Sequence, residues 1–197
     1  MKIRLVTVGK IKEKYLRDAV AEYAKRLSAY CTLEIVEVED EKTPDGAPPS
    51  VEEKILCTEG ERILRRIPER AYCTALAIEG RERSSVEFAE DLKKGMLRGK
   101  SDWCFVIGGS LGLSGAVLSR ADEKLSFSRM TFPHQLMRVI LLEQIYRAYR
   151  INAGVPYHKS FACFDSIVSS IYFGISFLSR SRERASSAYR ISSACVR

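Results

Sequence analysis

The sequence predicts an α/β domain with a mostly parallel β-sheet that is flanked by helices. Segments with the two-residue alternation of strands take turns along the chain with segments of helical spacing. The apolar run over residues 103–107 is unbroken, as expected of a strand buried on both faces of a sheet. Sheets of this kind bind ligands beyond the C-terminal ends of their strands. The loops that follow the strands are therefore the expected place of a functional site.

The first quarter of the chain predicts a strand, a helix and a second strand. Residues 3–8 (IRLVTV) have the composition of a strand, and apolar side chains from Tyr15 to Leu27 then recur at helical spacing up to about residue 29. Residues 32–38 (TLEIVEV) alternate again as a strand. Proline, glycine and acidic residues crowd the segment 40–50, which predicts a surface loop.

The middle of the chain predicts a helix, a strand and another helix. The helix covers about residues 51–66 and is ended by Pro68. The apolar segment that follows predicts a strand ending at Gly80. Ser84 and Glu87 have the spacing of a capping box, in which each side chain binds the backbone of the other residue. They predict a helix that runs towards residue 98.

The last elements surround the expected site. The strand over 103–107 runs directly into the glycines of GGSLG, Gly108 to Gly112. A short strand is predicted around Leu125, followed by the loop SFSRMTF and by a long helix after Pro133. If the sheet is parallel, Gly80, the glycine turn and the SFSRMTF loop lie at the same edge.

Composition limits the class of protein. A chain of 197 residues with 46% apolar residues can bury one substantial core. Its net charge of +7 is compatible with an anionic partner such as nucleic acid, although five of the arginines lie beyond residue 159. The N-terminus lacks the features of a signal peptide, and no apolar run approaches the roughly 20 residues that span a bilayer. A cytoplasmic protein without a membrane segment is expected.

The cysteines and histidines give no pattern of a metal site. None of the cysteines stands at C-x-x-C spacing, so they are predicted to be reduced, buried thiols. The two histidines, His134 and His158, are separated by 24 positions and have no cysteine pair beside them, so no metal is expected. The cysteines are Cys31, Cys57, Cys73, Cys104, Cys163 and Cys195.

The GGSLG segment has two further interpretations. It matches the G-x-S-x-G nucleophile elbow of α/β-hydrolases, which would make Ser110 a nucleophile. However, the chain is short for that fold, and it shows no oxyanion loop of the HGGG type. The glycines also lack the G-x-G-x-x-G spacing of dinucleotide folds. A glycine turn that lets a ligand approach the backbone is the favoured interpretation.

The helix after Pro133 carries the remaining polar candidates. His134 stands at the positive end of the helix dipole, which disfavours a cationic imidazole, so it is predicted to be a neutral structural residue rather than a general base. The apolar band of this helix is too broad for a helix that covers one face of a sheet, which predicts packing on two sides and a dimer. Glu143 and Arg147 stand four residues apart and form either an ordinary helix pair or part of a site.

Four segments of the chain resemble one known family. They are MKIRLVTVGKIKEKY at the start, FVIGGSLGL in the middle, LSFSRMTFPHQLMRVILLEQIYRAY, and the ending PYHK. Together they are similar to the ribosomal large-subunit pseudouridine methyltransferases of the RlmH family, over residues 1–159 without obvious gaps. Leu111 is a departure, because relatives often have a polar residue at this position of the glycine turn.

The resemblance implies a SPOUT-class methyltransferase, a homodimer whose C-terminal segment forms a trefoil knot. Such knots are rare exceptions to ordinary topology. The implied reaction transfers a methyl group from S-adenosyl-L-methionine to N3 of a pseudouridine in helix 69 of 23S rRNA, within the assembled ribosome. The implied cofactor residues are Leu76, Gly108, and the loop Phe127, Ser128, Arg129, Met130, Thr131 and Phe132.

The resemblance also implies catalytic residues. Tyr157, His158 and Lys159 of one subunit would complete the site of the other. Arg147, His158 and Lys159 are cations that could stabilise the anion of the pseudouridine ring, and Glu143 is placed in the site through its pairing with Arg147. We expect His158, rather than His134, to touch the substrate, and His134 to be a structural neighbour of the methyl donor. The sequence contains no separate RNA-binding module, so specificity is expected from the dimer surface meeting the folded ribosome.

Residues 160–197 depart from the family, whose members end at or just after the PYHK motif. This extension contains eleven serines, five arginines and no lysine. It is predicted to be a poorly ordered extension of a SPOUT domain that covers residues 1–159, and the alternative is an additional arm that contacts RNA. A tail that blocks turnover would make the chain a non-catalytic protein that binds RNA or cofactor.

Overall fold

A computed structural model describes residues 1–157, so His158, Lys159 and the extension 160–197 lie outside the described part. In the described part, five parallel strands form one sheet in the order β2-β1-β4-β3-β5. The predicted fold class is therefore confirmed. The strands are β1 (Lys2–Val8), β2 (Thr32–Val38), β3 (Tyr72–Glu82), β4 (Asp102–Ile107) and β5 (Glu123–Ser126).

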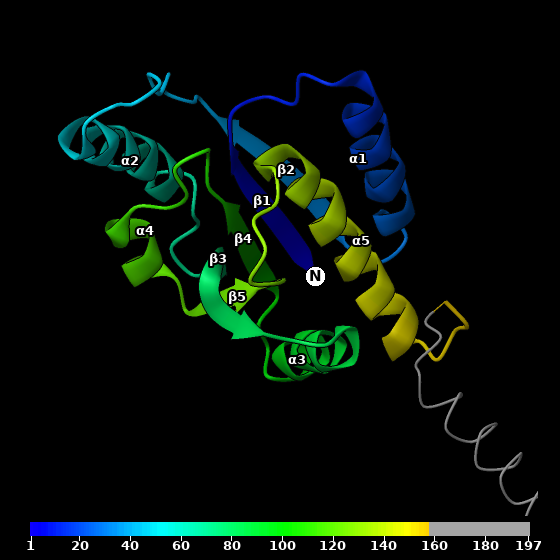
Figure 1. The fold of residues 1–197 in the computed structure, drawn as a ribbon. Helices are drawn as coiled ribbons and strands as arrows, with labels where there is room; N and C mark the ends of the chain where they lie inside the picture. The colour runs from blue at the N-terminus through cyan, green and yellow to red at the C-terminus, as the bar shows by residue number, and fades with distance from the viewer. Residues whose placement is uncertain (158–197) are drawn as a thin grey trace, which may run out of the picture. The chain divides into compact units, whose positions relative to one another are not determined.

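Helices cover both faces of this sheet (Figure 1). On one face, α1 (Lys14–Leu27) and α3 (Ser85–Leu97) flank α5 (His134–Asn152). On the other face lie α2 (Pro49–Leu64) and α4 (Gly115–Arg120). The short helix α4 was not predicted from the sequence, because six residues are too few to show helical periodicity.

The alternation of β1 divides the core into two layers. Ile3 and Leu5 pack towards α1, α3 and α5, whereas Val6 and Val8 pack towards α2 and α4. Successive side chains of a strand point to opposite faces, so both faces of a central strand must be apolar. β4 follows the same rule with Phe105 on the first face, which explains the unbroken apolar run in its sequence.

β3 is longer than predicted and is bent. It continues to Glu82 rather than ending at Gly80, and its pairing with β5 shifts between Leu76 and Arg81. A Cβ added to Gly80 would lie 2.6 Å from the backbone of Leu125, so glycine lets the two strands approach here. β3 pairs with β4 only up to Ala75, after which the bulge carries β3 away from β4. Leu76 is the last residue of β3 that pairs with β5 before the bulge.

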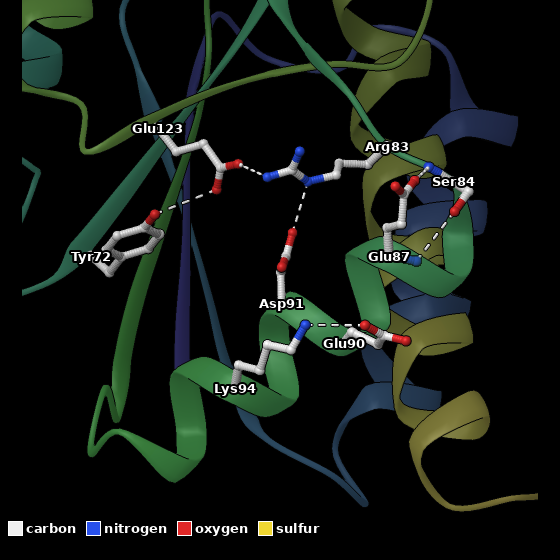
Figure 2. Close-up of polar contacts among 8 residues, drawn as sticks. All are labelled: Tyr72, Arg83, Ser84, Glu87, Glu90, Asp91, Lys94 and Glu123. Atoms are coloured by element: carbon white, nitrogen blue, oxygen red, sulfur yellow. Dashed lines mark hydrogen bonds and ion pairs between the residues drawn. The ribbon is translucent and has the colours of Figure 1, made fainter.

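The predicted capping box is present at the start of α3 (Figure 2). The backbone N–H of Glu87 donates to Oγ of Ser84 at 3.2 Å, and the backbone N–H of Ser84 donates to the Glu87 carboxylate at 2.8 Å. The hydrogen bonds from Ser84 lower the pKa of Glu87. Beside the cap, Arg83 bridges Asp91 of α3 at 2.7 Å and Glu123 of β5 at 3.0 Å. These contacts join α3 to the edge strand of the sheet.

Replacing Ser84 with alanine is expected to lower the free energy of unfolding by about 1 kcal/mol, because the backbone N–H of Glu87 in the first turn of α3 loses its side-chain acceptor. Chemical denaturation measured by circular dichroism checks this value. The matched control is Lys94→Gln, which removes an exposed ion pair with Glu90 on the same helix and should change stability by less than about 0.5 kcal/mol. Equal effects of the two substitutions would contradict the role of the cap.

Helix α5 lies between α1 and α3 and buries the side chains that face them and the sheet. This packing on two sides accounts for much of the broad apolar band that the sequence shows. Leu136 nevertheless remains 36% exposed, and Val139 and Ile140 are half-buried. α5 begins at His134 with Pro133 as its N-cap residue, one position earlier than the first-turn position predicted for Pro133.

Cys31, Cys73 and Cys104 are buried free thiols, as predicted. Cys57 is also a free thiol but is exposed, so the prediction of burial was wrong for this residue, which faces away from the sheet on α2. Cys163 and Cys195 lie outside the described residues. Over residues 1–157, no helix is long and apolar enough to cross a membrane.

Candidate functional site

A cleft of about 710 Å³ opens at the C-terminal ends of the central strands. This volume is in the range of sites for small molecules and cofactors. Three segments form most of its wall: residues 76–79 of the β3 bulge, the glycine turn after β4, and the loop between β5 and α5. The cleft is thus at the edge of the sheet that the strand pattern predicted.

Seven of the eight residues predicted to bind the cofactor line this single cleft. Arg129 is the exception, because it is exposed and is absent from the cleft wall. Leu111, the residue that departs from the family pattern, also lines the cleft. The seven residues are Leu76, Gly108, Phe127, Ser128, Met130, Thr131 and Phe132.

The turn after β4 depends on glycine at two positions. A Cβ added to Gly108 would lie 2.1 Å from the carbonyl oxygen of Gly112, so only glycine allows the turn to fold back on itself. Gly112 has a φ of 90°, a conformation that favours glycine. Within residues 1–157, the exposed Ser110 forms no side-chain hydrogen bond with a histidine or a carboxylate, as a nucleophile elbow would need. The geometry supports the ligand-binding turn.

A buried carboxyl group lies behind this turn. Glu59 of α2 is 5% exposed, and its Oε2 would lie 2.9 Å from a Cβ added to Gly109. Its Oε1 accepts a hydrogen bond from the backbone N–H of Glu41 at 3.0 Å. Burial raises the pKa of Glu59, and the nearby Asp40 acts in the same direction. No motif in the sequence marks this glutamate, because its position depends on how α2 packs.

Serine hydroxyls brace the loop between β5 and α5. Oγ of the buried Ser126 donates to the carbonyl oxygen of Ser128 at 3.1 Å. Oγ of Ser128 in turn accepts a hydrogen bond from the backbone N–H of Met130 at 3.0 Å. These local bonds fold the loop towards the cleft, while the Met130 side chain remains 72% exposed.

Arg138 fixes the start of α5 to the sheet. Its side chain is 1% exposed, although it stands on an apolar helix. Nη2 donates to the carbonyl oxygens of Val8 at 2.6 Å and Gly9 at 2.8 Å, and Nη1 donates to Glu37 at 2.9 Å. Arg138 therefore caps the C-terminal ends of β1 and β2. The sequence analysis missed this residue, although an arginine within an apolar stretch is a signal of a buried charge with partners.

His134 lines the cleft at the first position of α5 and is half-buried. Burial lowers the pKa of His134, and the positive charges of Arg138 and Lys12 act in the same direction, against the opposing effect of Asp40. The imidazole is therefore neutral near pH 7, in agreement with the prediction from the helix dipole. His134 was predicted to be a structural neighbour of the methyl donor, and the structure places it in the wall of this cleft.

Glu143, Arg147 and Tyr157 meet at the other end of α5. Oε1 of Glu143 accepts hydrogen bonds from Arg147 at 2.5 Å and from the Tyr157 hydroxyl at 3.3 Å. The guanidinium of Arg147 also lies over the Tyr157 ring, 5.1 Å from its centroid. Burial raises the pKa of Tyr157, which keeps its hydroxyl protonated as a donor. The structure thus brings together three of the predicted catalytic residues.

This group of three does not line the cleft of its own chain. Glu143 is six positions beyond Met137, the last residue of α5 in the cleft wall, and six helical residues span about 9 Å. His158 and Lys159, the other predicted catalytic residues, lie outside the described residues. In residues 1–157, no cluster of three or more histidine, cysteine or acidic side chains could hold a metal ion.

The cleft can hold an apolar ring and can offer hydrogen bonds. Leu76, Leu125 and Met137 contribute apolar surface, and the glycine turn brings backbone polar groups to the ligand. Ser110 and Thr131 add hydroxyl groups. Such a site suits the binding and positioning of a nucleoside-like molecule.

Comparisons with known proteins agree with this description. A family described as "Predicted SPOUT methyltransferase" matches residues 1–158. A protein of Bifidobacterium adolescentis named "Ribosomal RNA large subunit methyltransferase H" is 62% identical over 159 residues, which is 81% of this chain and all of the relative. A protein of the same name from Clostridioides difficile is 58% identical over the same shares of the two chains.

Among solved structures, a probable methyltransferase from Bordetella pertussis is similar with a TM-score of 0.44 and 14% identity. The similarity covers 75% of this chain and 95% of the other.

Proposed function

The chain belongs to the SPOUT methyltransferase family, whose members use S-adenosyl-L-methionine, and we propose that it methylates N3 of a pseudouridine in helix 69 of 23S rRNA within the assembled ribosome. The coarser activity of an rRNA methyltransferase follows from this family and from relatives named ribosomal RNA large subunit methyltransferase H. The target base, the position in the rRNA and the ribosomal context make up the proposal. Such an enzyme would work in the cytoplasm.

One observation carries the proposal furthest: residues from three separate segments, chosen from the sequence as a cofactor site, line one cleft. We assign this cleft to S-adenosyl-L-methionine. Backbone groups of the turn at Gly108 and the loop over residues 127–132 would hold the cofactor, and the apolar side chain of Leu76 would pack against it. When bound, the cofactor supplies an electrophilic methyl group. The protein then contributes mainly by aligning the acceptor nitrogen with that group.

The proposed enzyme is a homodimer. Ile78, Met130 and Leu136 are 51%, 72% and 36% exposed at or near the cleft, and exposed apolar side chains close together are typical of a protein interface. Glu143, Arg147 and Tyr157 can act on a substrate only if they reach the cleft of a second copy, because they do not line their own. The proposal also includes the trefoil knot of the C-terminal segment that the family resemblance implies.

The chain's polar residues would then act across the dimer interface. Loss of the N3 proton leaves negative charge on the imide, which a nearby cation stabilises. Arg147 is held in place by Glu143 and Tyr157, and His158 and Lys159 follow Tyr157 directly in the sequence. We propose that these three cations of one subunit face the target base held in the cleft of the other.

The test is methyl transfer from labelled S-adenosyl-L-methionine to ribosomes that lack this modification. We expect the label at N3 of one pseudouridine in helix 69, and at most a few per cent of that rate on protein-free 23S rRNA, because no separate RNA-binding module is present. Methylation of protein-free rRNA at the rate seen with ribosomes would contradict the proposal. In the same assay, His158→Ala should reduce the rate by at least tenfold, and a wild-type rate for this variant would contradict the role of His158.

A shortened chain distinguishes this proposal from the alternative, a non-catalytic protein whose tail blocks turnover. A version that ends at Lys159 and the full chain are compared for cofactor binding and for methyl transfer to ribosomes. An active short version beside an inactive full chain would favour the alternative for the full-length protein. Similar activity of the two would show that the extension does not block the reaction.

A further inference from the structure

The cleft contains few groups that can take up a proton. Of the described residues in its wall, only Glu79 and His134 have ionisable side chains; the others are apolar residues, glycines, serines and a threonine. Glu79 is exposed to solvent on the β3 bulge, whereas His134 is half-buried. His134 is therefore the natural candidate for any proton transfer in the cleft.

The surroundings of His134 keep its imidazole in the form that accepts a proton. The charged groups around it come from three elements: Lys12 from the loop after β1, Asp40 from the loop after β2, and Arg138 from the next turn of α5. The guanidinium of Arg138 is immobilised by three hydrogen bonds, so its charge stays close to the ring. The N-terminus of α5 adds a further positive potential.

His134 is also joined to the loop proposed to hold the cofactor. Only Pro133 separates it from the segment 127–132, and both line the same cleft. Gln135, the next residue, accepts a hydrogen bond from the backbone N–H of Lys12 at 3.2 Å, which ties the start of the helix to the loop after β1. The backbone next to His134 is thus tied to the loop after β1 on one side and continues into the loop that lines the cleft on the other.

We propose that His134 accepts the N3 proton of the target uracil ring during methyl transfer, an inference that rests on the proposed function above. The N3–H bond breaks and its proton passes to the free imidazole nitrogen. The nitrogen electron pair forms the bond to the methyl carbon, and the carbon–sulfur bond of the cofactor breaks with its electron pair remaining on sulfur. The products are the N3-methylated base, the neutral thioether and an imidazolium, which then releases its proton to water.

This role adds to the expectation that His158 touches the substrate. The sequence analysis assigned His134 a structural role only, because a cation is disfavoured at a helix N-terminus. The same physics favours a base, since a proton acceptor must be neutral before it acts. In this arrangement His134 takes the proton, and a cation from the other subunit stabilises the charge that forms on the ring.

The experiment compares wild type, His134→Asn, His134→Ala and the control Gly115→Ala, which lies outside the cleft wall, on unmodified ribosomes in single-turnover assays at saturating cofactor. We expect the His134 variants to lose about 10²- to 10⁴-fold in rate, while the Kd for S-adenosyl-L-methionine changes by less than about threefold. Added imidazole should restore part of the rate of His134→Ala, and Gly115→Ala should stay close to wild type. The wild-type rate should fall in acid, below the ordinary histidine pKa of about 6.5, and this limb should be absent from His134→Asn.

Three results would overturn the proposal. The first is a rate for His134→Asn within about threefold of wild type. The second is a loss of cofactor binding that accounts for the whole loss of rate, because His134 would then only shape the cleft. The third is an unchanged pH profile together with no rescue by imidazole. A wild-type chain that fails to methylate the ribosomes would instead refute the proposed function, so the two failures are distinguishable.

Discussion

Replacing Arg138 with methionine is expected to lower the free energy of unfolding by about 2–4 kcal/mol. Methionine retains most of the buried volume but removes every donor. The carbonyl oxygens of Val8 and Gly9 lose their hydrogen bonds to the guanidinium, and Glu37 loses its ion pair. Glu37 is 36% exposed and can be solvated again, so most of the cost comes from the two buried carbonyls. Urea denaturation followed by circular dichroism measures the change.

Two further variants show whether the several hydrogen bonds of the planar guanidinium account for this loss of stability. Arg138→Lys retains the charge but cannot reach three acceptors in one plane, so an intermediate loss is expected. Arg150→Met changes an arginine at the other end of α5, whose side chain donates a 3.5 Å hydrogen bond to the Tyr30 hydroxyl, and should cost less than about 0.5 kcal/mol. If Arg138→Met and Arg150→Met were equally mild, the buried network would not contribute as described.

Replacing Gly108 with alanine is expected to weaken S-adenosyl-L-methionine binding by at least tenfold, or about 1.4 kcal/mol. The added Cβ would lie 2.1 Å from the carbonyl oxygen of Gly112 and 2.5 Å from its carbonyl carbon. These are backbone atoms, so the turn must open, and the wall of the cleft moves with it. Calorimetric titration with the cofactor gives the Kd, and the loss of folding stability should be about 1–3 kcal/mol.

Gly115→Ala is the matched control for this substitution. It lies a few residues further on, in the first turn of α4, and a Cβ there would have no heavy atom within 4 Å. Alanine also favours helix over glycine, so stability should stay the same or rise by a few tenths of a kcal/mol, with unchanged cofactor binding. A Gly108→Ala protein that binds the cofactor as tightly as Gly115→Ala would contradict the assignment of the glycine turn.

Much of the fold was predictable because local signals and tertiary needs agree. The apolar run over residues 103–107 is a central strand, and the spacing of Ser84 and Glu87 is a capping box. The errors occur where the signal is short or absent. α4 has too few residues for periodicity, and the bend of β3 depends on how closely it approaches β5. Cys57 is exposed because it lies on the side of α2 that faces away from the sheet.

The cleft was predicted from two sources that converge. Parallel sheets place the ends of their strands at one edge, which selects the loops after β3, β4 and β5. The family resemblance then selected particular residues in those loops, and all but Arg129 line the cleft. The position of Arg129 on the exposed side of its loop depends on the serine hydrogen bonds at Ser126 and Ser128, which no pattern in the sequence indicates.

By itself, the sequence determined the parallel α/β class, the strand ends that form the site, and a neutral His134 at the start of a helix. These features follow from short-range rules of alternation, capping and dipoles, which act within a few residues. Only the tertiary structure decided that Arg138 binds the ends of β1 and β2 and that Glu59 lies behind the glycine turn. Those contacts join segments up to 130 positions apart, and no local pattern encodes them because they depend on how helices pack on the sheet.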